Sequence, residues 1–140
     1  FWTMWNTEDS TFRGRRLLVI DSIFIHHPQA TVFMLSPTLN DTRLFLPYRR
    51  RGYQIYAVNI SLDRMINWKW YLGNRSKDFL EHWNTSGTYF YSHVSDYMRA
   101  IALFLYGGTY MDMDALILQT LPRMEFIGYD RSGAGDGCSW

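Results

Sequence analysis

The sequence predicts a single α/β domain built on a parallel sheet. The first 58 residues alternate short apolar runs of strand type with stretches of helical spacing. A length of 140 residues suits one domain, and 47% hydrophobic with 19% charged residues excludes a disordered or fibrous chain. Because helices separate successive strands, neighbouring strands are expected to run parallel and to be joined by right-handed crossovers.

The first three elements are predicted by local patterns. Trp2 to Trp5 is expected to form a short strand. Arg15 to His27 carries its apolar residues on one helical face, and Pro28 follows as a stop, so a helix is expected there. Ala30 to Leu35 holds a continuous apolar run and is expected to be a buried strand.

A second helix is expected to begin at Asn40 or Asp41, either of which suits a cap, and to run towards Arg51. Gly52 suits its end, whereas Pro47 inside the stretch opposes a continuous helix.

Tyr53 to Val58 is rich in aromatic and β-branched residues, which predicts a third strand. Residues 59–88 are polar and rich in tryptophan, and loops with short helices are expected there.

Charge and composition restrict the partners. The chain has 14 Lys+Arg against 13 Asp+Glu, which argues against a dedicated nucleic-acid binder. Arg49-Arg50-Arg51 is expected to be a solvated helix end. The longest apolar run, Ala100 to Tyr106, is far shorter than the ~20 residues of a membrane span. A single cysteine, Cys138, excludes a disulfide within these residues.

Several features suggest a piece of a longer protein with a luminal or extracellular life. The chain begins at Phe1 rather than Met, and residues 133–137 are a glycine-rich stretch without a folding signal. Four N-glycosylation acceptor patterns begin at Asn40, Asn59, Asn74 and Asn84.

Isolated histidines and tryptophans carry weaker signals. The four histidines do not fall at a metal-binding spacing, so surface or packing roles are expected for His26, His27, His82 and His93. Stacking on a base or a sugar is one interpretation of Trp68, Trp70 and Trp83, and packing is the favoured one.

The segment from Ser92 to Leu121 carries the chemistry. Its first part has an apolar stripe at helical spacing, made by Val94, Tyr97, Met98, Ile101, Ala102 and Leu105. Ser92 or Ser95 is expected to cap this helix. Asp96 and Arg99 lie off the stripe and three residues apart, so they share one surface; spacing alone favours an intrahelical ion pair.

Gly107 and Gly108 are expected to end the helix, because glycine accepts the positive φ that a tight reversal needs. An extended chain should follow, with Met111 and Met113 facing the core. Because side chains alternate along a strand, Tyr110, Asp112 and Asp114 are expected on the opposite face. The two carboxylates would then lie about 7 Å apart along the strand.

Two carboxylates held together need a reason, since they repel one another. A hard divalent cation supplies one, because Mg²⁺ or Mn²⁺ takes one or two protein carboxylates together with water and phosphate oxygens. A lone Asp-x-Asp is, however, more often an acidic turn at a strand end.

The combined pattern is more specific. It resembles the sugar-nucleotide-binding region of the Asp-x-Asp glycosyltransferases of family 32, and is most like the α-1,4-galactosyltransferase and α-1,4-N-acetylglucosaminyltransferase members. The resemblance covers roughly residues 2 to 122. It is carried by Ser95-Asp96-x-x-Arg99, seven residues, Gly107-Gly108-x-Tyr110-x-Asp112-x-Asp114, then Leu116-Ile117-Leu118 and Leu121-Pro122.

The resemblance implies a GT-A fold, a Rossmann-like α/β sheet that binds a nucleotide sugar at the carboxyl ends of its strands. Residues 1–128 would be the N-terminal, incomplete portion of that domain, and 129–140 a flexible glycine-rich tail. It implies a retaining hexosyltransferase that uses Mn²⁺ or Mg²⁺.

The resemblance also implies roles for individual residues. Asp114 would ligate the metal, and Asp112 would contact the ribose or donor sugar and approach the metal. Asp96 and Arg99 would bind donor-sugar hydroxyls. The remaining site residues would shape the donor site, Ser95 at the helix start, Gly107 and Gly108 through the backbone, and Tyr110 by packing. No residue is assigned as a catalytic nucleophile or base.

The implied function is transfer of a hexose from UDP-galactose or UDP-N-acetylglucosamine to a glycan or glycolipid acceptor. The implied location is the Golgi lumen, in a type II membrane protein whose anchor lies upstream of these residues. Alternatives are a GDP-mannose-dependent mannosyltransferase and a non-catalytic nucleotide-sugar or carbohydrate-binding fragment. A haloacid dehalogenase-type phosphotransferase is faintly resembled by residues 111–116, but the lysines, Lys69 and Lys77, both lie upstream.

Overall fold

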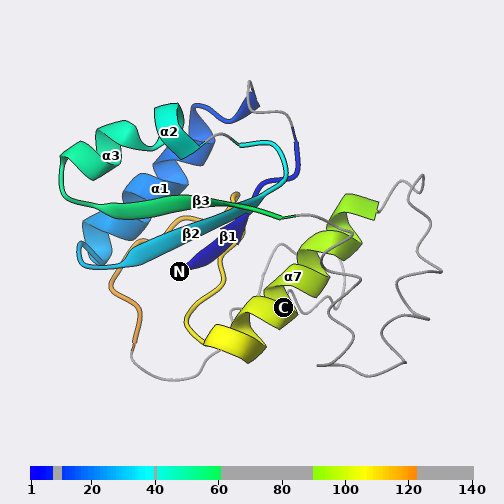
Figure 1. The fold of residues 1–140 in the computed structure, drawn as a ribbon. Coiled ribbons are helices and arrows are strands. Elements are labelled where there is room, and N and C mark those ends of the chain that lie inside the picture. Colours follow the sequence, from blue (N-terminus) through cyan, green and yellow to red (C-terminus); the bar gives the residue numbers. More distant parts are fainter. Residues whose placement is uncertain (8–10, 40, 61–89, 123–140) are drawn as a thin grey trace.

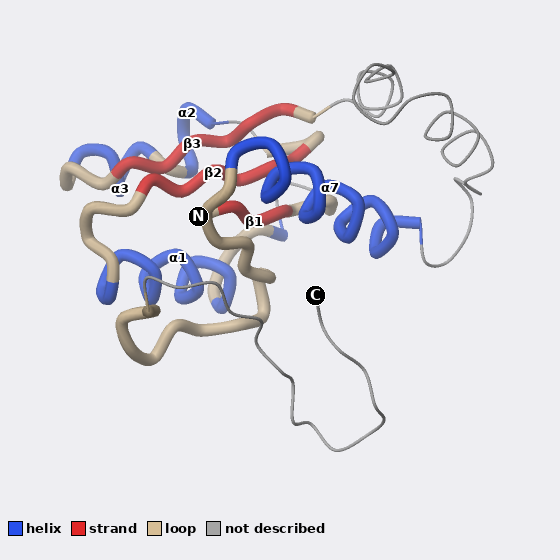
Figure 2. Tube along the Cα trace, turned by 90° about the horizontal axis from the view of Figure 1, so that it is seen from below, coloured by secondary structure: helices blue, strands red, loops and turns tan. Residues whose placement is uncertain are grey.

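The computed structural model describes residues 1–7, 11–39, 41–60 and 90–122. Predictions that fall elsewhere lie outside the described residues: the loops expected over 61–88, the glycine-rich tail, and the roles of Trp68, Trp70, Trp83, His82 and Cys138. The described part is an α/β structure with helices on both faces of a parallel sheet (Figures 1 and 2).

Three parallel strands form the sheet: β1 (Trp2–Met4), β2 (Thr31–Ser36) and β3 (Gln54–Asn59), in the order β1-β2-β3. The register pairs Met4 with Leu35, and Leu35 with Val58, so the carboxyl ends of the strands share one edge. The predicted strands and their parallel direction are confirmed.

A short segment joins the other side of β1. Trp2 and Tyr110 form an isolated parallel bridge. The Trp2 N–H donates to the Thr109 carbonyl at 2.8 Å, and the Met111 N–H donates to the Trp2 carbonyl at 2.9 Å. β1 therefore lies between β2 and residues 109–111, which extend the sheet at its far side.

Helix α1 (Arg15–His26) covers one face of the sheet. Its Ile20, Ile23 and Phe24 pack in the main core, where Val32 and Met34 come from β2 and Ile55 from β3. The predicted helix from Arg15 is confirmed, and His27 follows it directly before Pro28. Burial of these apolar side chains supplies most of the stabilisation of this layer.

The single helix expected up to Arg51 is wrong. Two short helices replace it, α2 (Asp41–Leu44) and α3 (Leu46–Arg50), with Pro47 in the first turn of α3. Proline has no N–H and clashes with the carbonyl four residues earlier, so it is tolerated only in a first turn. Phe45 lies at the break between the two helices, and its side chain is fully buried in the main core.

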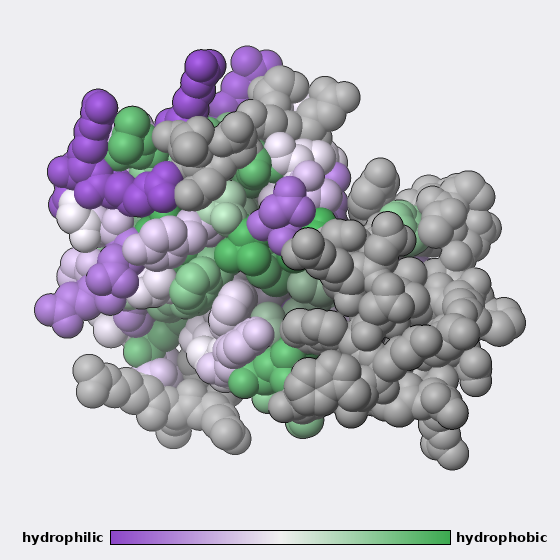
Figure 3. All heavy atoms as spheres, viewed as in Figure 1, coloured by the Kyte–Doolittle hydropathy of each residue, from purple (hydrophilic) through white to green (hydrophobic). Residues whose placement is uncertain are grey.

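The basic run at the end of α3 is solvated at Arg50 and Arg51, as predicted, whereas Arg49 is half-buried and lies over the Tyr56 ring. Arg49 and Arg50 are in the last turn of α3, and Arg50 and Arg51 are exposed. Hydrophilic side chains gather over the α2–α3 side of the face shown in Figure 3.

Helix α7 (Phe90–Tyr106) covers the opposite face of the sheet from α1, α2 and α3 (Figure 1). Its Val94, Met98 and Ala102 pack against Met4 and Leu35 in a second cluster. The apolar stripe predicted for this helix is thus the buried face. No helix within the described ranges is long and apolar enough to cross a membrane.

The end of α7 is as predicted, and its start is not. Gly107 and Gly108 have φ values of 64° and 94°, which favour glycine. The indole N–H of Trp2 donates to the Gly107 carbonyl at 2.9 Å and fixes this reversal beside β1. Ser92 and Ser95 are not caps, because the helix already begins at Phe90 and both serines lie inside it.

Candidate functional site

The chain order reverses at β1. The crossover through α1 leads from β1 to β2 on one side, whereas α7 leads to residues 109–111 on the other side. Open parallel α/β sheets bind ligands in the crevice outside the carboxyl ends of the strands at such a point. The topology therefore points to the space beyond Met4 and Met111.

An open pocket of ≈ 330 Å³ lies there. Asn6 enters it two residues after the end of β1, and Asp112 enters it directly after the 109–111 segment. The rest of the lining comes from the first half of α7: Ser92, Ser95, Asp96 and Arg99. The pocket is polar and carries two carboxylates and one guanidinium.

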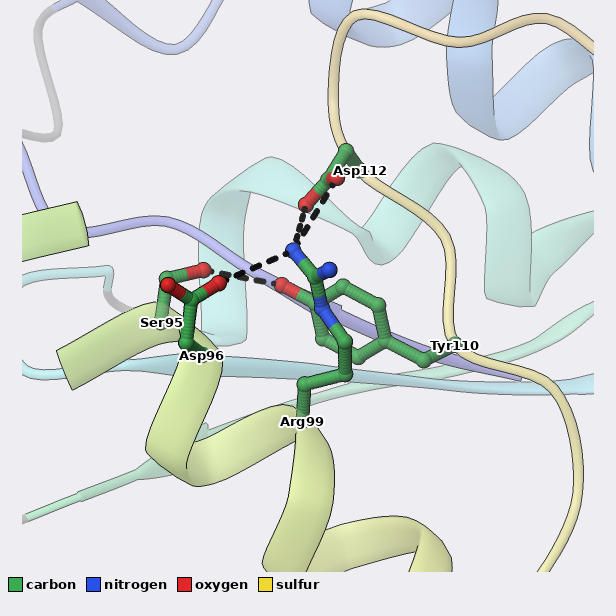
Figure 4. Close-up of polar contacts among 5 residues, drawn as sticks. All are labelled: Ser95, Asp96, Arg99, Tyr110 and Asp112. Atoms are coloured by element: carbon green, nitrogen blue, oxygen red, sulfur yellow. Dashed lines mark hydrogen bonds and ion pairs between the residues drawn. The ribbon is translucent and has the colours of Figure 1, made fainter. Parts of the chain in front are cut away.

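Arg99 connects the two carboxylates (Figure 4). Its Nη2 donates to both oxygens of Asp112, at 3.2 Å and 3.1 Å, and lies 3.5 Å from Oδ1 of Asp96. The side chain of Arg99 is only 11% exposed, whereas Asp112 is 43% and Asp96 65% exposed. The predicted Asp96–Arg99 pair exists, but the shorter contact joins Arg99 to Asp112.

Tyr110 lies behind Arg99 rather than in the pocket lining. Its ring centroid is 4.7 Å from the Arg99 Cζ, and its hydroxyl is 3.0 Å from the Ser95 hydroxyl. Burial raises the pKa of Tyr110 to about 12. The hydroxyl is therefore neutral at physiological pH and able to bond with Ser95.

The two aspartates of the Asp-x-Asp motif have different surroundings. Asp112 is half-buried; burial raises its pKa, the Arg99 cation opposes that rise, and the charge of Asp114 adds to it. Asp114 is exposed. The raised pKa of Asp112 shows that its charged form is disfavoured even beside Arg99.

The alternation predicted through Asp114 holds only in part. Met111 and Met113 pack against the main core, as predicted. The extended chain ends at Asp112, because a turn follows in which the Ala115 N–H donates to the Asp112 carbonyl at 3.3 Å. Asp114 lies in this turn, so strand alternation does not set the direction of its side chain.

The donor set fits a hard divalent cation. Asp112 and Asp114 offer carboxylate oxygens, and Mg²⁺ or Mn²⁺ needs only one or two protein carboxylates when phosphate and water fill its other positions. Burial is the main cause of the raised pKa of Asp112, and a cation would relieve the repulsion from Asp114 that adds to it. Among the described residues no group of three or more His, Cys, Asp or Glu side chains converges on one point. An ion held by only two aspartates would need a phosphate-bearing ligand and water at its other positions.

The segment after the motif is tied to α1. Ser22 accepts a hydrogen bond from the Ile117 N–H at 3.1 Å, and Nε2 of His27 accepts one from the Leu121 N–H at 3.1 Å. Ile117 is buried in the main core. These contacts fix the chain on the far side of Asp114, and they confirm a packing role for His27.

Two pocket residues are not site residues in the sequence interpretation. Asn6 has no expected role, and Ser92 is expected only as a cap. Asn6 could have been predicted from its position, because a polar residue just after the first parallel strand lies at the ligand-binding edge of the sheet. Ser92 is found by counting one turn back from Asp96 on the same helix surface.

The fold and the pocket define an α/β protein with an acidic, arginine-bearing site at the carboxyl edge of a parallel sheet. A family model described as the glycosyltransferase sugar-binding region containing the DXD motif matches residues 15–132. The chain belongs to this family. It carries the family's DXD motif as Asp112-Met113-Asp114, and a mixed α/β structure with a parallel sheet fits a GT-A-like domain.

A curated protein similar to this chain is an uncharacterized protein of Arabidopsis thaliana. It is 26% identical over 136 residues, which are 95% of this chain and 20% of that protein. This chain thus spans about a fifth of the length of the curated relative. No solved structure matches the chain.

Proposed function

We propose that these residues form the donor-binding part of a glycosyltransferase that moves a hexose from a nucleoside diphosphate to a glycan or glycolipid acceptor, with retention. The observation that carries this proposal is the place of the pocket. Asp96, Arg99 and Asp112 converge at the point where the chain order reverses, next to the DXD turn. A family built around sugar binding makes a nucleotide sugar the first ligand to test.

The pocket suits a polar ring with several hydroxyls. A carboxylate accepts hydrogen bonds from two hydroxyls, and a guanidinium donates to others, with the added strength of charge. Asp96 is well exposed beside the mostly buried Arg99, so a ligand can reach its free oxygens. We assign the hexose to Asp96 and Arg99. UDP-galactose or UDP-N-acetylglucosamine is the favoured donor, and GDP-mannose is the alternative.

Asp112 and Asp114 would hold Mn²⁺ or Mg²⁺ beside the diphosphate. When bound, such an ion acts as a Lewis acid that stabilises negative charge on the leaving diphosphate. Asp114, which is exposed at the turn, keeps its carboxylate available to an ion. Asp112 contributes from the pocket wall, where Arg99 holds both of its oxygens.

The chain's own residues act mainly by positioning. Arg99 is mostly buried and anchored, so ordering it upon binding costs little side-chain entropy. α7 presents Ser92, Ser95, Asp96 and Arg99 along one surface, and the sheet edge presents Asn6 and Asp112 opposite them. Acceptor contacts and any catalytic nucleophile or base would come from the larger protein.

The cellular setting is also part of the proposal. The near-neutral charge supports a carbohydrate rather than a nucleic-acid partner. Asn59, in the one acceptor pattern whose asparagine is described, is exposed at the end of β3. This exposure supports a luminal location, and we propose the Golgi lumen, reached through an anchor upstream of these residues.

Turnover by the full-length protein tests this function. Release of nucleoside diphosphate is measured with UDP-galactose, UDP-N-acetylglucosamine and GDP-mannose, in the presence of Mn²⁺ and after its removal by a chelator. The expected result is turnover of one donor that depends on the cation and falls at least a hundredfold in Asp114→Asn. Asp21→Asn on α1, across the sheet from α7, is the matched control and should keep full activity. Donor binding without turnover would favour a non-catalytic binding module.

A further inference from the structure

The guanidinium of Arg99 lies at the pocket wall, and its hydrogen bonding to the described residues is incomplete. Its guanidinium forms hydrogen bonds and ion pairs with other described residues only through one nitrogen, Nη2. Its Nε is shielded from solvent and has no hydrogen-bond partner among the described residues. Leaving a buried donor without a partner costs free energy. A further contact must therefore help to hold the guanidinium at the pocket wall.

The ring of Tyr110 supplies that support. The Arg99 Cζ is 4.7 Å from the ring centroid, well within the range of a cation–π contact (Figure 4). Such a contact attracts the whole guanidinium and partly compensates an N–H that has no oxygen acceptor. Because Arg99 is mostly buried, the contact is shielded from water and from salt.

Tyr110 is itself fixed at two points. Its backbone pairs with Trp2 of β1, so the Cα position is set by the sheet. Its hydroxyl bonds with Ser95, which lies on α7 one turn before Arg99. The ring is therefore held between the sheet edge and the helix, and it faces Arg99.

We propose that Tyr110, anchored through its hydroxyl to Ser95, is a positioning residue that holds the Arg99 guanidinium ready for the donor hexose. Tyr110 is not among the residues that line the pocket, so its effect on the sugar would be exerted through Arg99. This inference rests on the proposed function, because it assigns to Arg99 the contact with the sugar. It gives Tyr110 a positioning role, and it gives Ser95, which also lines the pocket, the role of anchoring the Tyr110 hydroxyl.

The decisive variant is Tyr110→Phe in the full-length protein, which keeps the ring and removes the anchor. Kd is measured by calorimetry for UDP and for the UDP-hexose that the wild type prefers. We expect Kd for UDP-hexose to rise about three- to tenfold, the worth of one hydrogen bond, and Kd for UDP to stay unchanged. Ser95→Ala breaks the same bond from the other side, and the double variant should be no weaker than Tyr110→Phe.

A second measurement needs no ligand. The Arg99 Nε–H is observed by nitrogen–proton correlation NMR and assigned by its loss in Arg99→Lys. We expect an upfield-shifted, slowly exchanging proton in the wild type, because Nε is shielded from solvent and the guanidinium lies against the ring. Tyr110→Phe should speed the exchange, and Tyr110→Leu should remove the upfield shift.

The outcomes separate this inference from the proposed function. Equal Kd values for UDP-hexose in wild type, Tyr110→Phe and Ser95→Ala would overturn the positioning role and leave the donor site intact. An equal rise for UDP and UDP-hexose would also overturn it, since a merely structural role predicts that result. A wild type that binds no nucleotide sugar would overturn the proposed function, and the NMR exchange rates would still decide whether Tyr110 holds Arg99.

Discussion

Arg99 and Asp112 come from different elements, 13 residues apart, and meet at 3.1 Å and 3.2 Å through one nitrogen and two oxygens. The contact joins the middle of α7 to the end of the segment that extends the sheet. It therefore holds the helix that bears Asp96 against the turn that bears Asp114. The positions of Asp96 and Asp114 relative to one another thus depend on the Arg99–Asp112 ion pair.

Replacing Arg99 by an uncharged residue should show how much the Arg99–Asp112 ion pair contributes to stability. Arg99→Met keeps an apolar stem but leaves Asp112 half-buried without its counterion, so we expect a loss of about 1–2 kcal/mol in the free energy of unfolding at pH 7. The loss should shrink at pH 4, because protonation of Asp112 removes the unpaired charge. Urea unfolding at both pH values measures it. Arg50→Met, at an exposed position of α3, should change stability by less than about 0.5 kcal/mol.

Asn6 should matter for binding. Asn6→Ala removes a polar group from the pocket at the end of β1, so we expect Kd for the nucleotide sugar to rise about three- to tenfold. Calorimetry on the full-length protein measures the change. Gln54→Ala is the control, since Gln54 carries an exposed side-chain amide at the start of β3 and does not line the pocket. Equal effects of the two substitutions would argue against a specific role for Asn6.

Stability should fall on mild acidification because of His27. Burial lowers the pKa of His27 below 6.5, and its Nε2 must be unprotonated to accept the Leu121 N–H. The unfolded chain therefore binds this proton more readily than the folded chain. The contribution is complete above pH 6.5 and is lost as pH falls below that value. Thermal unfolding from pH 8 to pH 5 should show the decline.

His27→Gln should flatten that part of the pH profile, because glutamine does not titrate. His93→Gln, at an exposed position of α7, is the control and should keep the decline. An identical pH profile in wild type and His27→Gln would contradict the role of the His27–Leu121 hydrogen bond.

The chain beyond the motif should depend on one buried side chain. Ile117 is 5% exposed and packs in the main core, whereas Leu118 is 82% exposed. Ile117→Ala should lower the free energy of unfolding by about 2–4 kcal/mol, and Leu118→Ala should have little effect. Chemical denaturation of the two variants measures the contrast. Comparable losses would mean that Leu118 is covered as well.

Much of the fold was predictable because its signals are local. The three strands are short apolar or β-branched runs, and α1 and α7 each show an apolar stripe that becomes the buried face. The glycines after α7 predict the reversal on their own, since their φ values are positive. The break between α2 and α3 was visible only as Pro47, and the burial of Phe45 that accompanies it is a tertiary effect.

The site was predictable residue by residue but not as a geometry. Spacing on a helix finds the Asp96–Arg99 neighbours, but it does not find that Arg99 prefers Asp112, which approaches from another element. Alternation fails at Asp114 because a turn replaces the strand. Asn6 carries no pattern of its own, and only the sheet order brings it to the pocket.

The most direct test of the donor site is a calorimetric titration of UDP into the full-length protein, with and without Mn²⁺, with GDP as the comparison nucleotide. We expect Mn²⁺-dependent binding of UDP that is stronger than that of GDP, is lost in Asp114→Asn and is retained in Asp21→Asn. Binding of UDP that is unchanged in Asp114→Asn, or no binding of either nucleotide by the folded protein, would contradict it.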